Sequence, residues 1–376
     1  ITGVTVPAVT APQPTVFSTH PAPATTNPPP TAPPVSSMPA GFHPLSVTFV
    51  SPEEGWVLGD TTAGGPALVG RTTDGGATWS LEGEVTAKPA GYQGLQIRFA
   101  DPEDGWVYAT GPTNNGNVLW STHDGGASWV AQQVTGVSTA SPRYIADLEA
   151  SGGEVYMAAN AGAGGFSILS TPAGADNWTA SPTVVPFGAG PVPDAQITLQ
   201  GRDGWIVEND RTVTAGARLT GGAWSNWTPP CKGSGGAAAV AASSTTDLVA
   251  VCEEGVWGPS DLGPGVVGNW LYTSSDGGST WQPVGQVTSK AFPPPALTTA
   301  PADPATVVTD GANGLVATFD GGHTWYTVYP ASASYVGFTT ATQGVAIVPA
   351  VPAMGGGGST MIMTRDGGHT WQPVTF

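Results

Sequence analysis

The sequence predicts an all-β protein: a single seven-bladed β-propeller of four-stranded blades, preceded by an extended Pro/Thr-rich segment. A motif of the form Thr/Ser-x-Asp-Gly-Gly-x-Thr/Ser-Trp recurs in five close and two degenerate copies. The closing tryptophans lie between 44 residues (Trp281 to Trp325) and 54 residues (Trp227 to Trp281) apart. Each interval holds short apolar runs divided by turn residues, which suits four strands. Such a period indicates radial or linear repetition. An open solenoid is the alternative, but it needs distinct polar end repeats, and the end repeats here are ordinary.

The motif predicts a hairpin turn that its own side chains hold together. Asp-Gly favours tight turns that need positive φ, and the Asp side chain can accept hydrogen bonds from nearby backbone N–H groups. The tryptophan ring can pack over the turn. We therefore assign a structural role to the Asp and Trp of the close copies, which are Asp74, Trp79, Asp124, Trp129, Asp276, Trp281, Asp320, Trp325, Asp366 and Trp371.

Metal binding by these aspartates is the weaker interpretation. Each motif offers one carboxylate, whereas calcium takes six to eight oxygen ligands. The five histidines show no metal-binding spacing. We expect no metal and no cofactor.

The first part of the chain has a different composition from the rest. Residues 1–42 are rich in Pro, Thr and Ala, and residues 27–34 should be extended polyproline II. We expect a linker here. The alternatives are a tether and an arm that docks on a neighbouring molecule. Residues 43–376 form the predicted propeller.

The blades follow one another in order. In blade one, residues 45–50 alternate like a strand, 51–55 form a turn, 56–58 and 67–71 are the next strands, and the motif leads to the fourth. Blade two repeats this pattern closely. The first strands of the later blades are expected near residues 144, 195–199, 237–240, 296 and 335–338.

The octapeptide resembles the Asp-box, or BNR, repeat of sialidases, sortilin-type receptors and related propellers, in which it is a structural element of the rim. The longer unit, with Phe49 and Gly55-Trp56 ahead of Trp79, resembles the repeat of the photosystem II stability and assembly factor family. The resemblance covers residues 43–376 and implies the fold. That family is described as meeting its partner through an arginine-lined surface. The seven arginines here are scattered, so we do not transfer that role.

Composition excludes some partners and suggests a compartment. The net charge is −17, with ten Lys and Arg, which argues against nucleic acid and against electrostatic binding to anionic lipid. No run is long and apolar enough to span a membrane. The chain starts at Ile1, which fits a processed leader. Cys231 and Cys252 could be thiols or a disulfide. We favour the disulfide, because the other features suggest a secreted or cell-surface protein.

The loops between second and third strands vary most, and loops on a rigid scaffold usually carry function. The loop of blade five, residues 253–268, is the longest. Trp257 could stack on a ligand, with Glu253, Glu254 and Asp261 as acceptors. A solvated loop without a ligand is the alternative.

Catalysis has little support. The arginine cluster and the Tyr–Glu pair of sialidases have no counterpart. The acidic pairs Glu53/Glu54 and Glu103/Asp104 occupy the same turn in two adjacent blades, so we interpret them as residues that the turn requires. We predict no catalytic residues. The sequence favours an exported, non-catalytic module that binds another protein or copies of itself. The alternative is a carbohydrate-binding or sialidase-like glycoside hydrolase.

Overall fold

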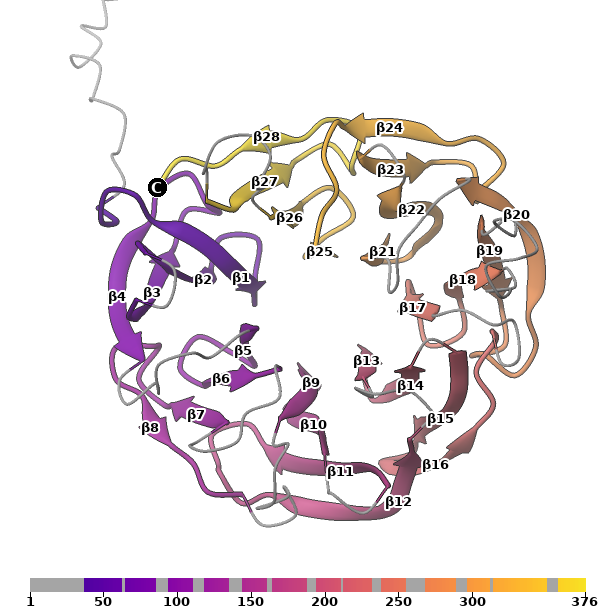
Figure 1. Cartoon of the computed structure of the whole chain (residues 1–376), viewed down its shortest axis with the longest axis horizontal. Coiled ribbons are helices and arrows are strands. Elements are labelled where there is room, and N and C mark those ends of the chain that lie inside the picture. Colours follow the sequence, from indigo (N-terminus) through magenta and orange to yellow (C-terminus); the bar gives the residue numbers. More distant parts are fainter. Residues whose placement is uncertain are drawn as a thin grey trace, which may run out of the picture. The chain divides into compact units, whose positions relative to one another are not determined.

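Seven antiparallel sheets of four strands form a ring around a central channel (Figure 1). The computed structural model describes residues 37–62, 65–85, 94–110, 118–134, 144–160, 164–187, 194–210, 212–231, 238–254, 268–288, 296–311, 314–349 and 358–376. All of them belong to one unit, residues 35–376. They contain no helix, and therefore no helix that could cross a membrane. The predicted all-β, seven-bladed propeller is confirmed.

Within each blade the chain runs outward from the channel, and each strand pairs with the next. Blade one contains β1 (His43–Phe49), β2 (Gly55–Asp60), β3 (Ala67–Thr72) and β4 (Ser80–Val85). Blade two contains β5 (Leu95–Phe99), β6 (Gly105–Ala109), β7 (Leu119–Thr122) and β8 (Val130–Ala131). Blade three contains β9 (Ile145–Ser151), β10 (Glu154–Asn160), β11 (Gly165–Pro172) and β12 (Thr179–Pro186).

The other four blades repeat this order. Blade four contains β13 (Asp194–Gln200), β14 (Asp203–Asp210), β15 (Thr212–Thr220) and β16 (Ala223–Trp227). Blade five contains β17 (Ala238–Ala242), β18 (Leu248–Glu254), β19 (Gly268–Ser274) and β20 (Gln282–Thr288). Blade six contains β21 (Leu297–Ala300), β22 (Asp303–Gly311), β23 (Gly314–Thr318) and β24 (Tyr326–Tyr329). Blade seven contains β25 (Tyr335–Phe338), β26 (Gly344–Val348), β27 (Thr360–Thr364) and β28 (Gln372–Pro373).

The core lies between neighbouring blades. Second strands are buried almost throughout, as in β2 and β6, because blades cover both of their faces. The ring of Trp56 in blade one stacks on Phe99 of blade two, with centroids 3.9 Å apart. Large apolar side chains therefore join each sheet to the next one.

Among the described residues, no strand is exchanged between blades seven and one, and contacts of side chains and backbone join these two blades. Phe376 packs against Phe42 and Trp79, with ring centroids 5.0 and 5.6 Å apart. Arg365 Nη2 donates to the Gly75 carbonyl at 2.6 Å. Of the predicted linker, residues 1–36 lie outside the described residues. The described residues 37–42 pack on blade one, where Met38 and Phe42 are buried.

Candidate functional site

Each intact Asp-box is a closed local network, as blade five illustrates. The Asp276 carboxylate accepts hydrogen bonds from the Thr280 backbone N–H at 2.9 Å and the Thr280 hydroxyl at 2.7 Å. The Ser274 hydroxyl donates to the same carboxylate and accepts from the Gly278 N–H. The hydrogen bonds from Thr280 and Ser274 lower the pKa of Asp276 to about 2. The carboxylate is thus committed to the turn.

In blades one and four, the tryptophan near the start of the second strand ties its blade to the Asp-box of the next blade. Trp56 Nε1 donates to the Gly125 carbonyl at 2.7 Å, and Trp205 Nε1 donates to the Gly277 carbonyl at 3.1 Å. The acceptor in both cases is the first glycine of the neighbouring box. The Gly-Trp and Asp-box motifs are therefore two halves of one contact between blades.

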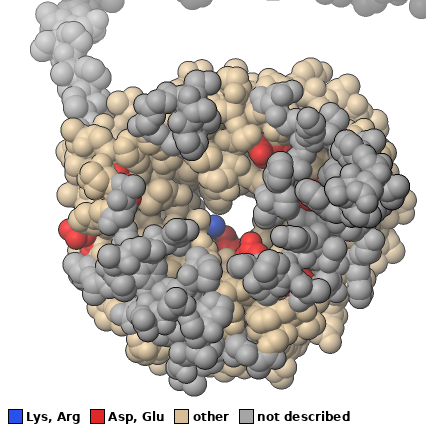
Figure 2. Space-filling view, viewed as in Figure 1, with Lys and Arg blue, Asp and Glu red and all other residues tan. Residues whose placement is uncertain are grey.

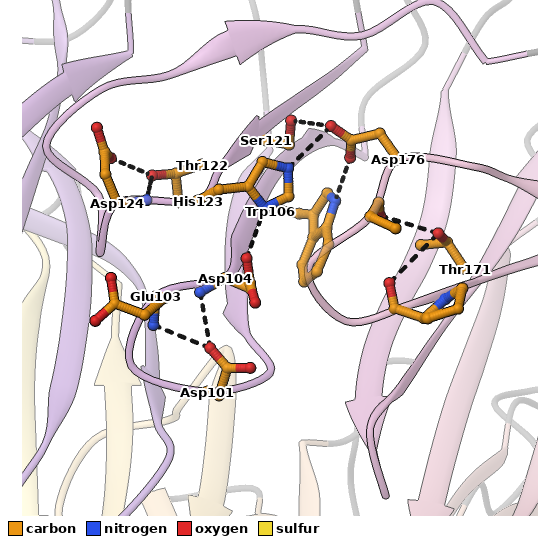
Figure 3. A network of polar contacts seen from close by, with 12 residues as sticks. Asp101, Glu103, Asp104, Trp106, Ser121, Thr122, His123, Asp124, Thr171 and Asp176 are labelled. Atoms are coloured by element: carbon orange, nitrogen blue, oxygen red, sulfur yellow. Dashed lines mark hydrogen bonds and ion pairs between the residues drawn. The ribbon is translucent and has the colours of Figure 1, made fainter.

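Blades two and three replace this contact with a different polar cluster (Figure 3). Blade three has a degenerate box in which Ala173 stands in the aspartate position, and Trp106 Nε1 donates to Asp176 at 3.3 Å instead. His123 lies between two carboxylates, 2.6 Å from Asp104 and 3.2 Å from Asp176. Burial opposes the imidazolium, but these hydrogen bonds outweigh it and raise the pKa of His123. His123 thus bridges the two blades, and its position between two carboxylates favours the imidazolium form.

The acidic turn pairs serve the fold, in agreement with the turn interpretation. The Asp101 carboxylate accepts from the backbone N–H groups of Glu103 and Asp104, both at 2.9 Å. Ser51 Oγ accepts in the same way from Glu53 and Glu54. These turns hold the second strand at the point where it meets the neighbouring Asp-box.

The central channel contains a cavity of about 670 Å³, lined by the first strands of blades two to seven. Most of the coloured surface around its mouth is neither acidic nor basic, but basic and acidic atoms lie side by side at the margin of the hole (Figure 2). The charged residues that line it are Arg98, Asp147, Glu149 and Asp194, and they are accompanied by Tyr108 and Tyr335. This charged cluster, which we call the channel cluster, is the candidate site.

Arg98 is the centre of the channel cluster. Its Nε lies 2.7 Å from Glu149, its Nη1 donates to the Ile97 carbonyl, and its guanidinium lies over the Tyr335 ring, 5.3 Å from the centroid. The side chain is 10% exposed. Burial raises the pKa of Glu149, although Arg98 acts in the opposite direction. The pair is held firmly and still borders the cavity.

Asp147 and Asp194 supply two further carboxyl groups. Asp147 accepts from the Tyr108 hydroxyl at 2.9 Å and from the Leu148 and Ile197 backbone N–H groups. Asp194 lines the same cavity, and the backbone N–H of Ala195 donates to its carboxylate at 2.9 Å. Burial, with Asp147 and Glu208 adding repulsion, raises the pKa of Asp194 to about 7.

The predicted loop of blade five is described only in part. Trp257 and Asp261 lie outside the described residues. Glu253 is buried within β18, opposite Asn269 of β19, and Glu254 ends that strand. The ligand role of this loop remains a prediction. Cys231 and Cys252 form the predicted disulfide, which joins the connection after blade four to β18.

The channel cluster was missed, although the sequence carried a signal for it. Polar residues occupy alternate positions of the first strands, as in Gln96 and Arg98, and in Asp147 and Glu149. Alternate positions share one face of a strand, and in an innermost strand that face borders the channel. Among the described residues, no group of His, Cys, Asp and Glu could hold a metal ion.

Comparison with known proteins identifies the family. The family model described as Photosynthesis system II assembly factor YCF48 matches residues 35–255. The chain belongs to this family. A solved structure of YCF48 bound to a D1 peptide aligns with it at 18% identity and a TM-score of 0.53, covering 88% of this chain and 93% of that one. No curated protein matches the chain.

Two enzymes have similar folds. An ancestral GH74 enzyme has a TM-score of 0.51 at 13% identity, with 90% of this chain and 45% of the enzyme covered. An ulvan lyase of family PL25 has a TM-score of 0.50 at 11% identity, with 92% and 96% covered. At these identities the likeness shows the fold alone.

Proposed function

We propose that this protein is an exported, non-catalytic assembly factor that binds a segment of another protein in its central channel. The observation that carries the proposal is the polar cavity of about 670 Å³ around Arg98. Its size is within the usual range of ligand sites. Membership of the YCF48 family supports a role in assembly. A related propeller is bound to a peptide, which supports a peptide ligand here.

The charges of the channel favour a partner segment that carries Lys or Arg. Among the described residues that line the cavity, three carboxyl groups, those of Asp147, Glu149 and Asp194, accompany one guanidinium, that of Arg98. The whole chain has a net charge of −17. Attraction of this kind speeds encounter and weakens as salt is added.

The contacts of the carboxyl groups favour binding over glycoside hydrolysis. Hydrolysis of that kind generally needs two carboxyl groups acting on the sugar. Glu149 is paired with Arg98, and Asp147 accepts three hydrogen bonds. Asp194 alone is left with few contacts.

Export is supported by the disulfide between Cys231 and Cys252, because disulfides persist mainly in oxidising compartments. Alkylation of free thiols in intact cells, followed by mass spectrometry, tests this part. We expect both cysteines to be protected. Labelled thiols on the folded protein would contradict export.

The binding proposal can be tested by selecting peptides from a display library on the whole chain and measuring their affinity by calorimetry. We expect peptides rich in Lys or Arg. Their affinity should fall at least tenfold in Ala242→Trp, because Ala242 lines the cavity and the larger ring would occupy space that the peptide needs. Asp194→Asn should also weaken binding, and the remaining affinity should depend less on salt, because one attracting carboxylate is removed. Ala77→Trp, on an exposed Asp-box, is the matched control. Equal binding to Ala242→Trp, or no enriched peptide, would reject the channel as the site.

A further inference from the structure

A second cavity, of about 560 Å³, lies between blades three and four and is lined by the turns after β9, β13 and β15. It is therefore on the face of the ring that carries the Asp-boxes, whereas the channel cluster lines the central cavity. We call it the blade 3–4 groove. Its wall is formed by β10, β11, β12 and the start of β16.

Two features of the sequence shape this groove. Tyr156 pairs with Ser170 just as Trp56 pairs with Arg71, so a tyrosine stands where blades one, two and four have a tryptophan and where blades five, six and seven have a valine. Blade four also lacks an Asp-box loop. Thr220 pairs with Ala223 across a two-residue turn, where blade one has residues 73–79. The short turn removes material from this junction, and the tyrosine ring is left at its wall.

The two-residue turn depends on glycine. Gly221 and Gly222 have φ values of 61° and 83°, which glycine adopts at little cost. A Cβ at either position would have no atom within 4 Å. Glycine is therefore favoured by the positive φ of the backbone, and not by a lack of space. The short turn is thus a local property of blade four.

The side chains of the groove combine aromatic rings with polar groups. The Tyr156 ring, which is partly exposed, packs edge-to-face on Trp224, 5.5 Å between centroids. Burial raises the pKa of Tyr156, Glu154 raises it further and Arg202 lowers it, so both charges act on the tyrosine hydroxyl. The hydroxyl groups in the lining belong to Ser151, Ser170, Thr179 and Ser181.

These features favour a neutral ligand that has both an apolar face and many hydroxyls. Glu154 and Arg202 cancel in charge, so the groove has no preference for an ion. A peptide strand would have to pair along β12, but Pro182 lines the groove and has no N–H to donate. A sugar ring can stack on an aromatic side chain while its hydroxyls bond to the carboxylate, the guanidinium and the serines.

We propose that the blade 3–4 groove binds a neutral oligosaccharide, with Tyr156 stacking on one sugar ring and with Glu154 and Arg202 bonding to its hydroxyls. This role does not depend on the proposed binding of a protein segment in the channel.

The test is a screen of neutral oligosaccharides against the whole chain by saturation-transfer NMR, followed by titration of the best ligand. We expect millimolar to micromolar binding. Tyr156→Ala should lower the affinity at least tenfold, and Arg202→Ala severalfold. Ala180→Trp, whose new ring enters the groove without changing Tyr156, should abolish binding. Tyr326→Ala removes an aromatic side chain that is 54% exposed on β24 and is the matched control.

Any of the following results would overturn the proposal: no neutral oligosaccharide binds the folded chain at 10 mM, binding persists in Ala180→Trp, or Tyr326→Ala loses as much affinity as Tyr156→Ala. Displacement of a bound sugar by the channel-selected peptides would place the sugar in the channel and would also overturn it. Thermal melting of each variant distinguishes lost binding from lost folding.

Discussion

The Asp-box aspartates show how much a turn can change one exposed carboxyl group. The folded-state pKa of Asp276, about 2, is below the value of about 3.9 in an unfolded chain. Its contribution to stability is therefore complete above pH 4 and is lost as the pH falls through the folded pKa. Hydrogen bonding to Thr280 has the largest influence on the pKa of Asp276, and burial has a smaller one.

We predict that Asp276→Asn makes the protein less sensitive to acid between pH 4 and pH 2, although it lowers stability at pH 7. Urea unfolding at several pH values measures this. Asp101→Asn is the comparison: the Asp101 carboxylate accepts a hydrogen bond in the turn between β5 and β6, so this variant gives the effect of a turn outside the boxes. An unchanged pH dependence in Asp276→Asn would show that the box does not keep this group ionised.

His123 should produce the opposite pH dependence. Its folded-state pKa is raised, so its stabilising contribution is present below about pH 6.5 and is lost as the pH rises through the folded value. We predict that wild-type protein melts at a lower temperature at pH 8.5 than at pH 5.5, and that His123→Gln removes part of this difference. NMR titration of the imidazole gives the pKa directly. A value at or below 6.5 would contradict the bridging role.

At the scale of single elements, the tryptophan contact between blades has a measurable consequence. Trp56→Phe leaves the buried Gly125 carbonyl without its donor, and an unsatisfied buried acceptor costs about 1–3 kcal/mol. We predict a loss of this order in the free energy of unfolding, beyond the loss from packing.

Trp224→Phe is the control, because Trp224 is also buried and its Nε1 makes no hydrogen bond within the described part of the structure. Chemical denaturation of both variants isolates the hydrogen bond. Equal losses would mean that the Gly125 contact adds nothing to the junction.

The elements also differ in how far sequence alone could predict them. All partners of Asp276 lie within four residues, so the box follows from the local sequence. The pair of Arg98 and Glu149 spans 51 residues, and it exists only because two blades place their first strands side by side. Predicting the groove at Tyr156 from the sequence would likewise require knowing which blades are neighbours.

At the scale of the whole molecule, the disulfide links two parts of the chain that belong to different blades. Cys231 follows blade four and Cys252 lies in β18, with a sequence separation of 21 residues. Closing a loop of this length stabilises a protein by about 3 kcal/mol in the chain-entropy model. We predict a loss of this size in Cys231→Ala/Cys252→Ala, measured by urea denaturation against the oxidised wild type. A stability equal to that of the oxidised wild type would show that the link is dispensable.

Because every sheet is built from one continuous stretch of chain, sequence repeat and structural unit coincide in this propeller. In the described part of the chain each blade is built from its own four strands, and the seam between blades seven and one is held by contacts such as that of Arg365 with Gly75. A gene of this kind can gain, lose or reorder whole units of about fifty codons without breaking a sheet. Circular permutants cut at different connections between blades should share one architecture, which makes the family suitable for recombining blades by design.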